Sequence, residues 1–171
     1  MISDKDYVNL RSHYRIVSYF MRKDLEDRVN RSVELFKNGY NCAQSVIVAF
    51  ADLYGFTESQ AMMVSSGFGA GIAKTRQMCG AVSGTVMLCG LERGNDEPGN
   101  NRRAAECFGL VREVLKAFKE ENGSTTCADL LGLNGKIKKP GSDETYEIRP
   151  CAKKVECAAR IFAEKLEELG K

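Results

Sequence analysis

Seven cysteines make thiols the most reactive side chains of this 171-residue chain. Four of them, Cys42, Cys79, Cys127 and Cys151, stand in or next to the first turn of a predicted helix. A helix start offers unpaired backbone N–H groups and the positive end of the helix dipole, so it favours a thiolate and lowers the cysteine pKa. These four residues are therefore the candidates for metal ligation or for thiol chemistry.

Spacing alone does not decide whether the four thiols share one site. Long intervals separate them, and the chain lacks the Cys-x-x-Cys pair that is typical of zinc and thioredoxin-type sites. The other three cysteines, Cys89, Cys107 and Cys157, fall inside predicted helices. We expect those three to be small buried hydrophobic residues, because free cysteine is among the most buried residue types.

A glycine-rich run leads into Cys79 and continues into the helix that follows it. Glycine permits positive φ and a close approach of other atoms. No strand precedes the run and no Lys-Ser/Thr pair follows it, so the sequence does not support a phosphate-binding P-loop. We predict that these glycines let another helix or a cofactor come close. The candidate cofactor-contacting positions are Gly67, Gly69, Gly71, Gly80 and Gly84.

Few charged or imidazole groups accompany the cysteines. Lys74 and Arg76 stand near Cys79 and could stabilise a thiolate or an anionic ligand, although solvated loop charges are the default expectation. His13 is the only histidine and has no cysteine near it in sequence, so we expect it at the surface. A Cys-His pair of the hydrolase type is therefore not supported.

Capping residues predict where the helices that carry the cysteines begin. Asn41 followed by Gln44 predicts an N-cap just before Cys42, and Thr57 with Gln60 predicts a second, shorter helix. Ser124 or Thr125 is expected to cap the short helix whose first turn holds Cys127, and Pro150 is expected at the start of the last helix. The four cysteines thus depend on four separate helix starts.

The fold class follows from apolar spacing. Residues at three- and four-residue steps predict helices along the chain, and no strand of convincing length occurs. We predict an all-α, single-domain bundle of about six to seven helices with a glycine-rich loop. Residues 1–30 are predicted to be an N-terminal helical extension and residues 31–171 the cysteine-bearing domain. One predicted helical face combines Phe108, Val111, Leu115 and Phe118.

Charge and composition exclude several classes of function. The net charge is +2, with 25 basic and 23 acidic residues spread along the chain, which gives no field suited to nucleic acid or to an anionic membrane. No run approaches the length of a membrane-spanning helix, and the N-terminus lacks the apolar core of a signal peptide. We therefore expect a cytoplasmic protein whose thiols stay reduced.

Several short motifs, in order, resemble a known family. They are Asn-Cys-Ala-Gln at 41–44, Gly-Phe-Gly-Ala-Gly at 67–71, Cys-Gly-Ala-Val-Ser-Gly at 79–84, Cys-Ala-Asp-Leu-Leu-Gly at 127–132 and Pro-Cys at 150–151. Together they resemble the redox-active family named C-GCAxxG-C-C. The resemblance covers roughly Ser32 to Leu166, although this chain has CGAxxG where the family name has GCAxxG.

The resemblance implies that Cys42, Cys79, Cys127 and Cys151 are the shared cysteines of a redox-active protein that carries an iron–sulfur cluster or another prosthetic group. The leading hypothesis is that the four cysteines ligate an iron–sulfur cluster for electron transfer to a redox partner protein. Thiolate-only ligation also suits zinc.

Two alternatives stay open at this point. The first is metal-free thiol–disulfide exchange, with Cys42 and Cys79 as the catalytic pair. The second is a non-enzymatic helical protein with a structural zinc or with reduced buried thiols. A homo-oligomer formed through the N-terminal helix is a further expectation.

Overall fold

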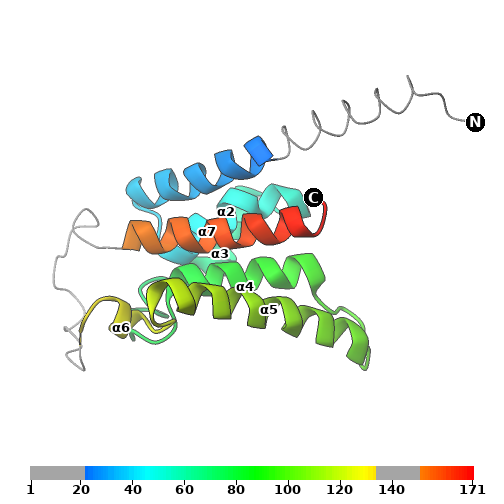
Figure 1. Ribbon diagram of the computed structural model, residues 1–171. Helices are drawn as coiled ribbons and strands as arrows, with labels where there is room; N and C mark the ends of the chain where they lie inside the picture. The colour runs from blue at the N-terminus through cyan, green and yellow to red at the C-terminus, as the bar shows by residue number, and fades with distance from the viewer. Residues whose placement is uncertain (1–21, 134–150) are drawn as a thin grey trace, which may run out of the picture.

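The computed structural model describes residues 22–133 and 151–171 of the chain. Within these ranges it contains seven α-helices, two short 3-10 helices and no strand, which confirms the prediction of an all-α domain. The helices lie side by side in a bundle (Figure 1). They are the helix over residues 22–37, α2 (Cys42–Phe50), η1 (Ala51–Tyr54), α3 (Glu58–Ser65), η2 (Ser66–Phe68), α4 (Gly80–Arg93), α5 (Asn101–Asn122), α6 (Cys127–Leu130) and α7 (Cys151–Glu168).

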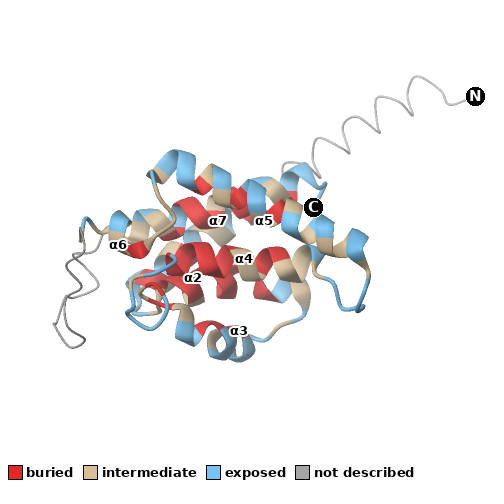
Figure 2. Cartoon of the chain, turned by 90° about the horizontal axis from the view of Figure 1, so that it is seen from below, coloured by how far each residue is buried: buried red, intermediate tan, exposed pale blue. Residues whose placement is uncertain are grey.

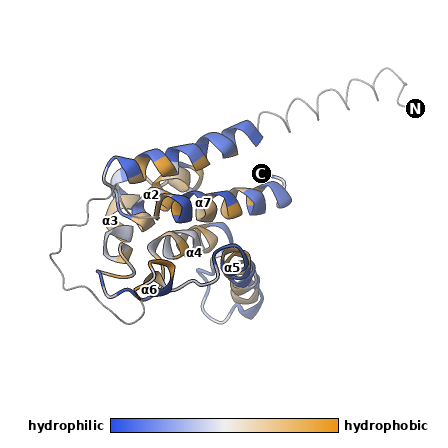
Figure 3. Cartoon of the chain, turned by 60° about the vertical axis from the view of Figure 1, so that its left-hand side comes forward, coloured by the Kyte–Doolittle hydropathy of each residue, from blue (hydrophilic) through white to orange (hydrophobic). Residues whose placement is uncertain are grey.

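Helix α2 forms the centre of the core. All of its residues except Gln44 are buried, and Figure 2 shows the buried residues concentrated on α2, α4 and α7. The sequence of α2 explains this position, because it is apolar or small on every side, and a helix that is apolar all round must be covered by other elements. The polar faces of the 22–37 helix and α7 lie on the outside of the bundle (Figure 3).

Small residues allow α2 and α4 to pack closely. A Cβ atom at Gly84 would lie 2.8 Å from the backbone oxygen of Ala43 and 3.1 Å from Cβ of Val46. Both distances are shorter than ordinary van der Waals contacts, so only glycine fits at this crossing. The sequence-based expectation that this glycine serves close helix packing agrees with that geometry.

Helix α7 covers α2 and α4 from the other side. The rings of Phe50 and Phe162 meet edge to face with their centroids 5.3 Å apart, a favoured aromatic geometry. The hydroxyl group of Thr85 in α4 donates to the backbone oxygen of Ala158 in α7 at 3.3 Å. These contacts hold the middle of α7 against α2 and α4, and Cys151 is the first residue of the same helix.

The predicted face of α5 is partly wrong. The buried residues of α5 are Leu110, Val114 and Phe118, whereas Phe108 is 61% exposed. The buried residues of α5 are spaced four apart, whereas the predicted residues alternate between steps of three and four. The two sets form neighbouring stripes on the same helix, and the elements that pack against the helix determine which stripe is buried.

The predicted caps are confirmed for α2 and α3 but not for α6. Asn41 and Thr57 each form a capping box with the glutamine three residues later. The N-cap of α6 is Thr126, not Ser124 or Thr125. The hydroxyl oxygen of Ser124 instead accepts a hydrogen bond from the backbone N–H group of Thr126 at 3.0 Å.

Some predictions concern residues outside the described ranges. These are the helix proposed within residues 1–21, with His13, and the segment that ends at Pro150. The division between residues 1–30 and 31–171 stays a prediction, and so does an oligomer formed through the N-terminal helix. Among the described helices, none has the length and apolar character needed to cross a membrane.

Candidate functional site

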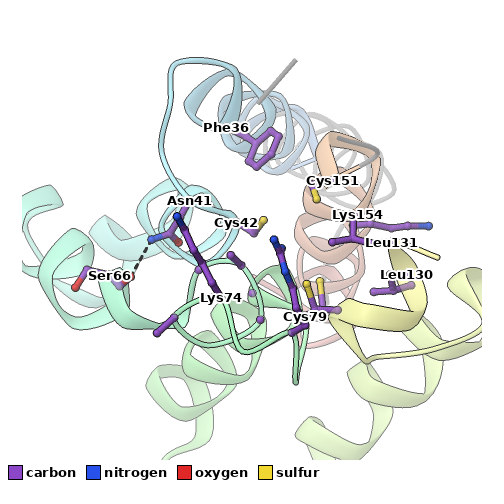
Figure 4. A pocket seen from close by; sticks show the side chains of 17 residues that line it. Phe36, Asn41, Cys42, Ser66, Lys74, Cys79, Leu130, Leu131, Cys151 and Lys154 are labelled. Atoms are coloured by element: carbon purple, nitrogen blue, oxygen red, sulfur yellow. Dashed lines mark hydrogen bonds between the residues drawn. The ribbon is translucent and has the colours of Figure 1, made fainter. Parts of the chain in front are cut away.

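Each of the four candidate cysteines stands at a helix start, as predicted. Cys42, Cys127 and Cys151 are the first residues of α2, α6 and α7, and Cys79 is the N-cap of α4. All four line one cavity with a volume of about 220 Å³. In Figure 4 the sulfur atoms of Cys42, Cys79 and Cys151 face the same central space. The fold therefore brings the four thiols together in spite of their long sequence intervals.

Asn41 positions Cys42 by joining the start of α2 to the glycine-rich segment. Its side-chain oxygen accepts hydrogen bonds from the backbone N–H groups of Ala43 and Gln44, both at 3.0 Å. Its side-chain nitrogen donates to the backbone oxygen of Ser66 at 3.1 Å (Figure 4). A Cβ atom at Gly69 would lie 2.5 Å from Cγ of Asn41, so this contact requires glycine.

A short backbone pairing holds Cys79 and Cys127 on adjacent segments. An isolated antiparallel bridge joins Met78 to Thr126. The N–H group of Cys79 donates to the oxygen of Thr125 at 2.8 Å, and the N–H group of Cys127 donates to the oxygen of Gln77 at 2.6 Å. The two cysteines therefore stand in fixed register, although 47 residues separate them in sequence.

The loop that precedes this bridge has an unusual backbone. Residues 70–74 and Arg76 all have φ between 48° and 69°, and only Gly71 among them is a glycine. The left-handed region is unfavourable for other L-residues by about 1–2 kcal/mol each. Hydrogen bonds from the N–H group of Ala73 to the oxygen of Gly67, at 2.9 Å, and from Gln77 to Gly71, at 3.1 Å, close the loop. Non-glycine residues in this region tend to cluster at functional sites.

The predicted glycines fall into two groups. Gly69, Gly71 and Gly80 line the cavity, whereas Gly67 and Gly84 are not among the lining residues. A Cβ atom at Gly71 would lie 2.5 Å from Cβ of Cys127, and one at Gly80 would lie 3.1 Å from Cβ of Cys42. These two glycines therefore allow the cysteine-bearing segments to approach each other.

The pKa values of two thiols differ from the sequence-based expectation. The pKa of Cys42 is raised by its hydrogen bond with the thiol of Cys151, by burial and by the neighbouring sulfur atoms of Cys79 and Cys127. Burial raises the pKa of Cys79 to about 11, although the backbone N–H groups of Val82 and Ala81 donate to its sulfur and lower it. Burial and neighbouring sulfurs thus outweigh the effect of the helix starts on the pKa of these two thiols.

The cavity also contains residues that sequence analysis had not placed there. Phe36, from the 22–37 helix, covers it, and Lys154 follows Cys151 by one turn on α7. That three-residue spacing was a usable signal for Lys154, because residues i and i+3 share a helix face. Nothing in the local sequence around Phe36 indicates that it reaches the cysteines.

The lining residues bear only one sign of formal charge. Lys74, Arg76 and Lys154 line the cavity, and none of its described lining residues is Asp or Glu. The Nε atom of Arg76 is buried and has no hydrogen-bond partner among the residues that the structure describes. Within the same ranges, no three His, Cys, Asp or Glu residues are grouped closely enough to hold one metal ion. The described lining residues thus present positive charge and no carboxylate to the cavity.

The remaining cysteines lie outside this cavity. Cys89 and Cys157 are buried, as predicted, whereas Cys107 is partly exposed. The sulfur of Cys157 accepts a hydrogen bond from the side-chain nitrogen of Asn122 at 3.2 Å and donates to a carboxylate oxygen of Glu121 at 3.5 Å. Variants of these three cysteines can therefore serve as controls for variants of the cavity cysteines.

Comparisons with known proteins identify the family of the chain. A family described as "Putative redox-active protein (C_GCAxxG_C_C)" matches residues 40–165, a range that contains all four cavity cysteines. A relative from Archaeoglobus fulgidus, named "Uncharacterized protein", is 31% identical over 120 residues, which cover 63% of this chain and 76% of the relative. No solved structure matches the chain.

Proposed function

Since the chain belongs to the C-GCAxxG-C-C family of redox-active proteins, we propose that its four cavity cysteines ligate an iron–sulfur cluster that transfers electrons. One observation carries this proposal. Cys42, Cys79, Cys127 and Cys151 come from four separate helix starts and line the same cavity. Thiolates are the ligands that hold iron–sulfur clusters in proteins.

The size of the cavity supports a group larger than one ion. A tetrahedral zinc site holds its sulfur ligands about 2.3 Å from the metal, which requires the sulfurs to be tightly grouped. The cavity measures about 220 Å³, which is more space than a single ion needs. A structural zinc is therefore the less favoured occupant.

The surroundings of the thiols also suit an anionic cluster. The N–H groups of Ala81 and Val82 donate to the sulfur of Cys79, and such donors stabilise a thiolate ligand. Lys74 and Arg76 add positive charge without any carboxylate among the described lining residues. When bound, a cluster would supply reversible one-electron chemistry, and net charge and hydrogen bonds to sulfur would set its potential. The electron donor or acceptor would be a redox partner protein.

Thiol–disulfide exchange is the second candidate function. The thiols of Cys42 and Cys151 are hydrogen-bonded to each other, so this pair is closer to a disulfide than the Cys42–Cys79 pair that sequence analysis favoured. Oxidation would join the two sulfurs and release two protons and two electrons to a disulfide-bearing partner. Peptide mapping after mild oxidation tests this candidate: it predicts a Cys42–Cys151 peptide that is two hydrogens lighter, and full retention of both free thiols would eliminate it.

Anaerobic purification tests the leading proposal. We expect a coloured protein that contains iron and acid-labile sulfide in similar amounts, or one that acquires both when it is reconstituted with iron and sulfide. A colourless protein that stays free of iron after reconstitution would contradict the proposal. Visible absorption and iron and sulfide analysis provide the readouts.

A further inference from the structure

The cavity has a positively charged wall, and its three cations differ in what they contact. Lys154 donates from Nζ to the side-chain oxygen of Asn122 at 2.7 Å. In Figure 4 its side chain extends away from the cysteines. Lys74 is exposed to solvent. Arg76 is different, because its Nε atom is buried and unpaired with respect to the described residues.

A buried N–H group without an acceptor is energetically costly, and the cost is larger when the group is charged. In native structures almost all buried polar groups have a partner, which can be another protein group, an ordered water or a bound ion. A protein chain could have relieved the cost with one carboxylate, but none stands among the described lining residues. The acceptor for Arg76 is therefore expected to come from a ligand.

The backbone fixes Arg76 next to the cysteines. Its φ is 64°, and its carbonyl oxygen accepts from the N–H group of Ala128 at 3.1 Å. The next residue, Gln77, accepts from the N–H group of Cys127. A Cβ atom at Gly71 would lie 2.9 Å from Cα of Arg76, so the loop is tightly packed around this residue. Arg76 thus sits beside the bridge that carries Cys79 and Cys127.

We propose that Arg76 makes this cavity a binding site for a small oxyanion, which the guanidinium group holds beside the thiols. The guanidinium group is planar, always charged and rich in N–H donors, so it recognises oxyanions by charge-assisted hydrogen bonds. The proposal goes beyond cluster ligation, because it concerns the metal-free protein. An anionic cluster would also place negative charge beside Arg76. The experiment below distinguishes a cluster from a small oxyanion as the acceptor.

The test compares two alkylating reagents of similar size on the reduced, metal-free protein. Iodoacetate carries a carboxylate and iodoacetamide is neutral. In both reactions the thiolate sulfur forms a bond to carbon and iodide leaves. The ratio of the two rates therefore cancels any change in thiol pKa and reports only on the anion. Mass spectrometry of the Cys79 and Cys127 peptides gives both rates.

We expect Arg76→Gln to lower the iodoacetate-to-iodoacetamide ratio about tenfold, the size of one charge-assisted hydrogen bond. Lys154→Gln is the matched control, since it removes a cavity cation that already has a partner, and it should change the ratio less than about twofold. Arg76→Lys should give an intermediate ratio. An unchanged ratio in Arg76→Gln would overturn the proposal.

Sulfate is the oxyanion probe for the unaltered protein, and it decides the matter even if Arg76→Gln does not fold. At equal ionic strength, sulfate should slow iodoacetate more than chloride does. Equal protection by the two salts would also overturn the proposal. Iron-free protein after reconstitution, together with protection by sulfate, would mean that cluster ligation is wrong and that the oxyanion site is correct. A reconstituted cluster, together with no specific effect of sulfate, would mean that the oxyanion site is wrong and that cluster ligation is correct.

Discussion

At the scale of single residues, the positions without side chains control how closely the cysteine-bearing helices approach. Gly84 and Gly90 lie on the same helix but differ in surroundings. A Cβ atom at Gly84 would meet the backbone oxygen of Ala43, whereas no atom lies within 4 Å of a Cβ at Gly90. Substituting each glycine with alanine therefore separates the effect of close helix packing on stability from the effect of helix propensity.

We predict opposite effects for these two glycines. Gly84→Ala should lower the free energy of unfolding by about 1–3 kcal/mol, because overpacking forces α2 and α4 apart. Gly90→Ala should raise it by up to about 1 kcal/mol, because alanine is the better helix former. Urea denaturation measures both. Equal effects of the two substitutions would show that α2 and α4 are not in close contact.

Residue identity predicted the caps of α2 and α3 and the positions of the cysteines at helix starts, but not the backbone of the loop before Cys79. Cys42 and Asn41 form a local pattern that needs only a few neighbouring residues. The left-handed backbone of residues 70–74 could not be predicted, because alanine, isoleucine and lysine disfavour that region. The raised pKa of Cys42 depends on three sulfurs from distant segments, and no local pattern contains that information.

At the scale of elements, each cysteine depends on how its helix begins. Asn41 and Thr57 cap α2 and α3 in the same way, but only Asn41 also donates to Ser66 and adjoins Cys42. The two caps should therefore contribute similarly to stability and differently to the site. Thr57 provides a matched control for Asn41.

Asn41→Ala and Thr57→Ala should each lower the free energy of unfolding by about 1 kcal/mol, the usual value of an N-cap. Only Asn41→Ala should change the rate at which Cys42 reacts with iodoacetamide, because only that cap holds the start of α2 against the loop. Denaturation and peptide mass spectrometry provide the two readouts. A changed Cys42 rate in Thr57→Ala would indicate a general loosening of the fold instead.

The sequence predicted which segments are helical better than it predicted which elements those helices pack against. The start of α6 was misplaced by one or two residues, because its cap, Thr126, makes no side-chain capping bond and is fixed by its bridge to Met78. The exposed Phe108 was assigned to the buried face of α5 for the same reason: the contacting helix, not the apolar spacing, selects the stripe. Convergence of the four cysteines is likewise a property of tertiary packing.

At the scale of the whole molecule, an ion pair joins the 22–37 helix to the core. Arg28 donates to both carboxylate oxygens of Asp52, at 2.6 and 3.0 Å, and to the backbone oxygen of Ala49 at 3.0 Å. The hydrogen bond from Arg28 lowers the pKa of Asp52. The same helix carries Phe36 over the cavity, so this link helps to hold the cover of the site in place.

Because the folded-state pKa of Asp52 is below its unfolded value of about 3.9, its contribution is present above that pH and is lost as the pH falls. Asp52→Asn should lower the stability at pH 7 by up to about 1 kcal/mol, since the carboxylate is largely exposed, and should have little effect near pH 2. Glu106→Gln, which alters a long, exposed pair with Arg102, serves as the control and should be neutral at both pH values. An Asp52→Asn effect that did not change with pH would contradict this account.

The central claim is that Cys42, Cys79, Cys127 and Cys151 act as one site, and iron and sulfide analysis of reconstituted serine variants tests it most directly. Each of these four cysteines, changed singly to serine, should lose most of the iron and sulfide, because every ligand contributes to the same cluster. Cys107→Ser should retain the full amount, since Cys107 lies outside the cavity. Equal iron and sulfide in all five variants, or none in the unaltered protein, would contradict the claim.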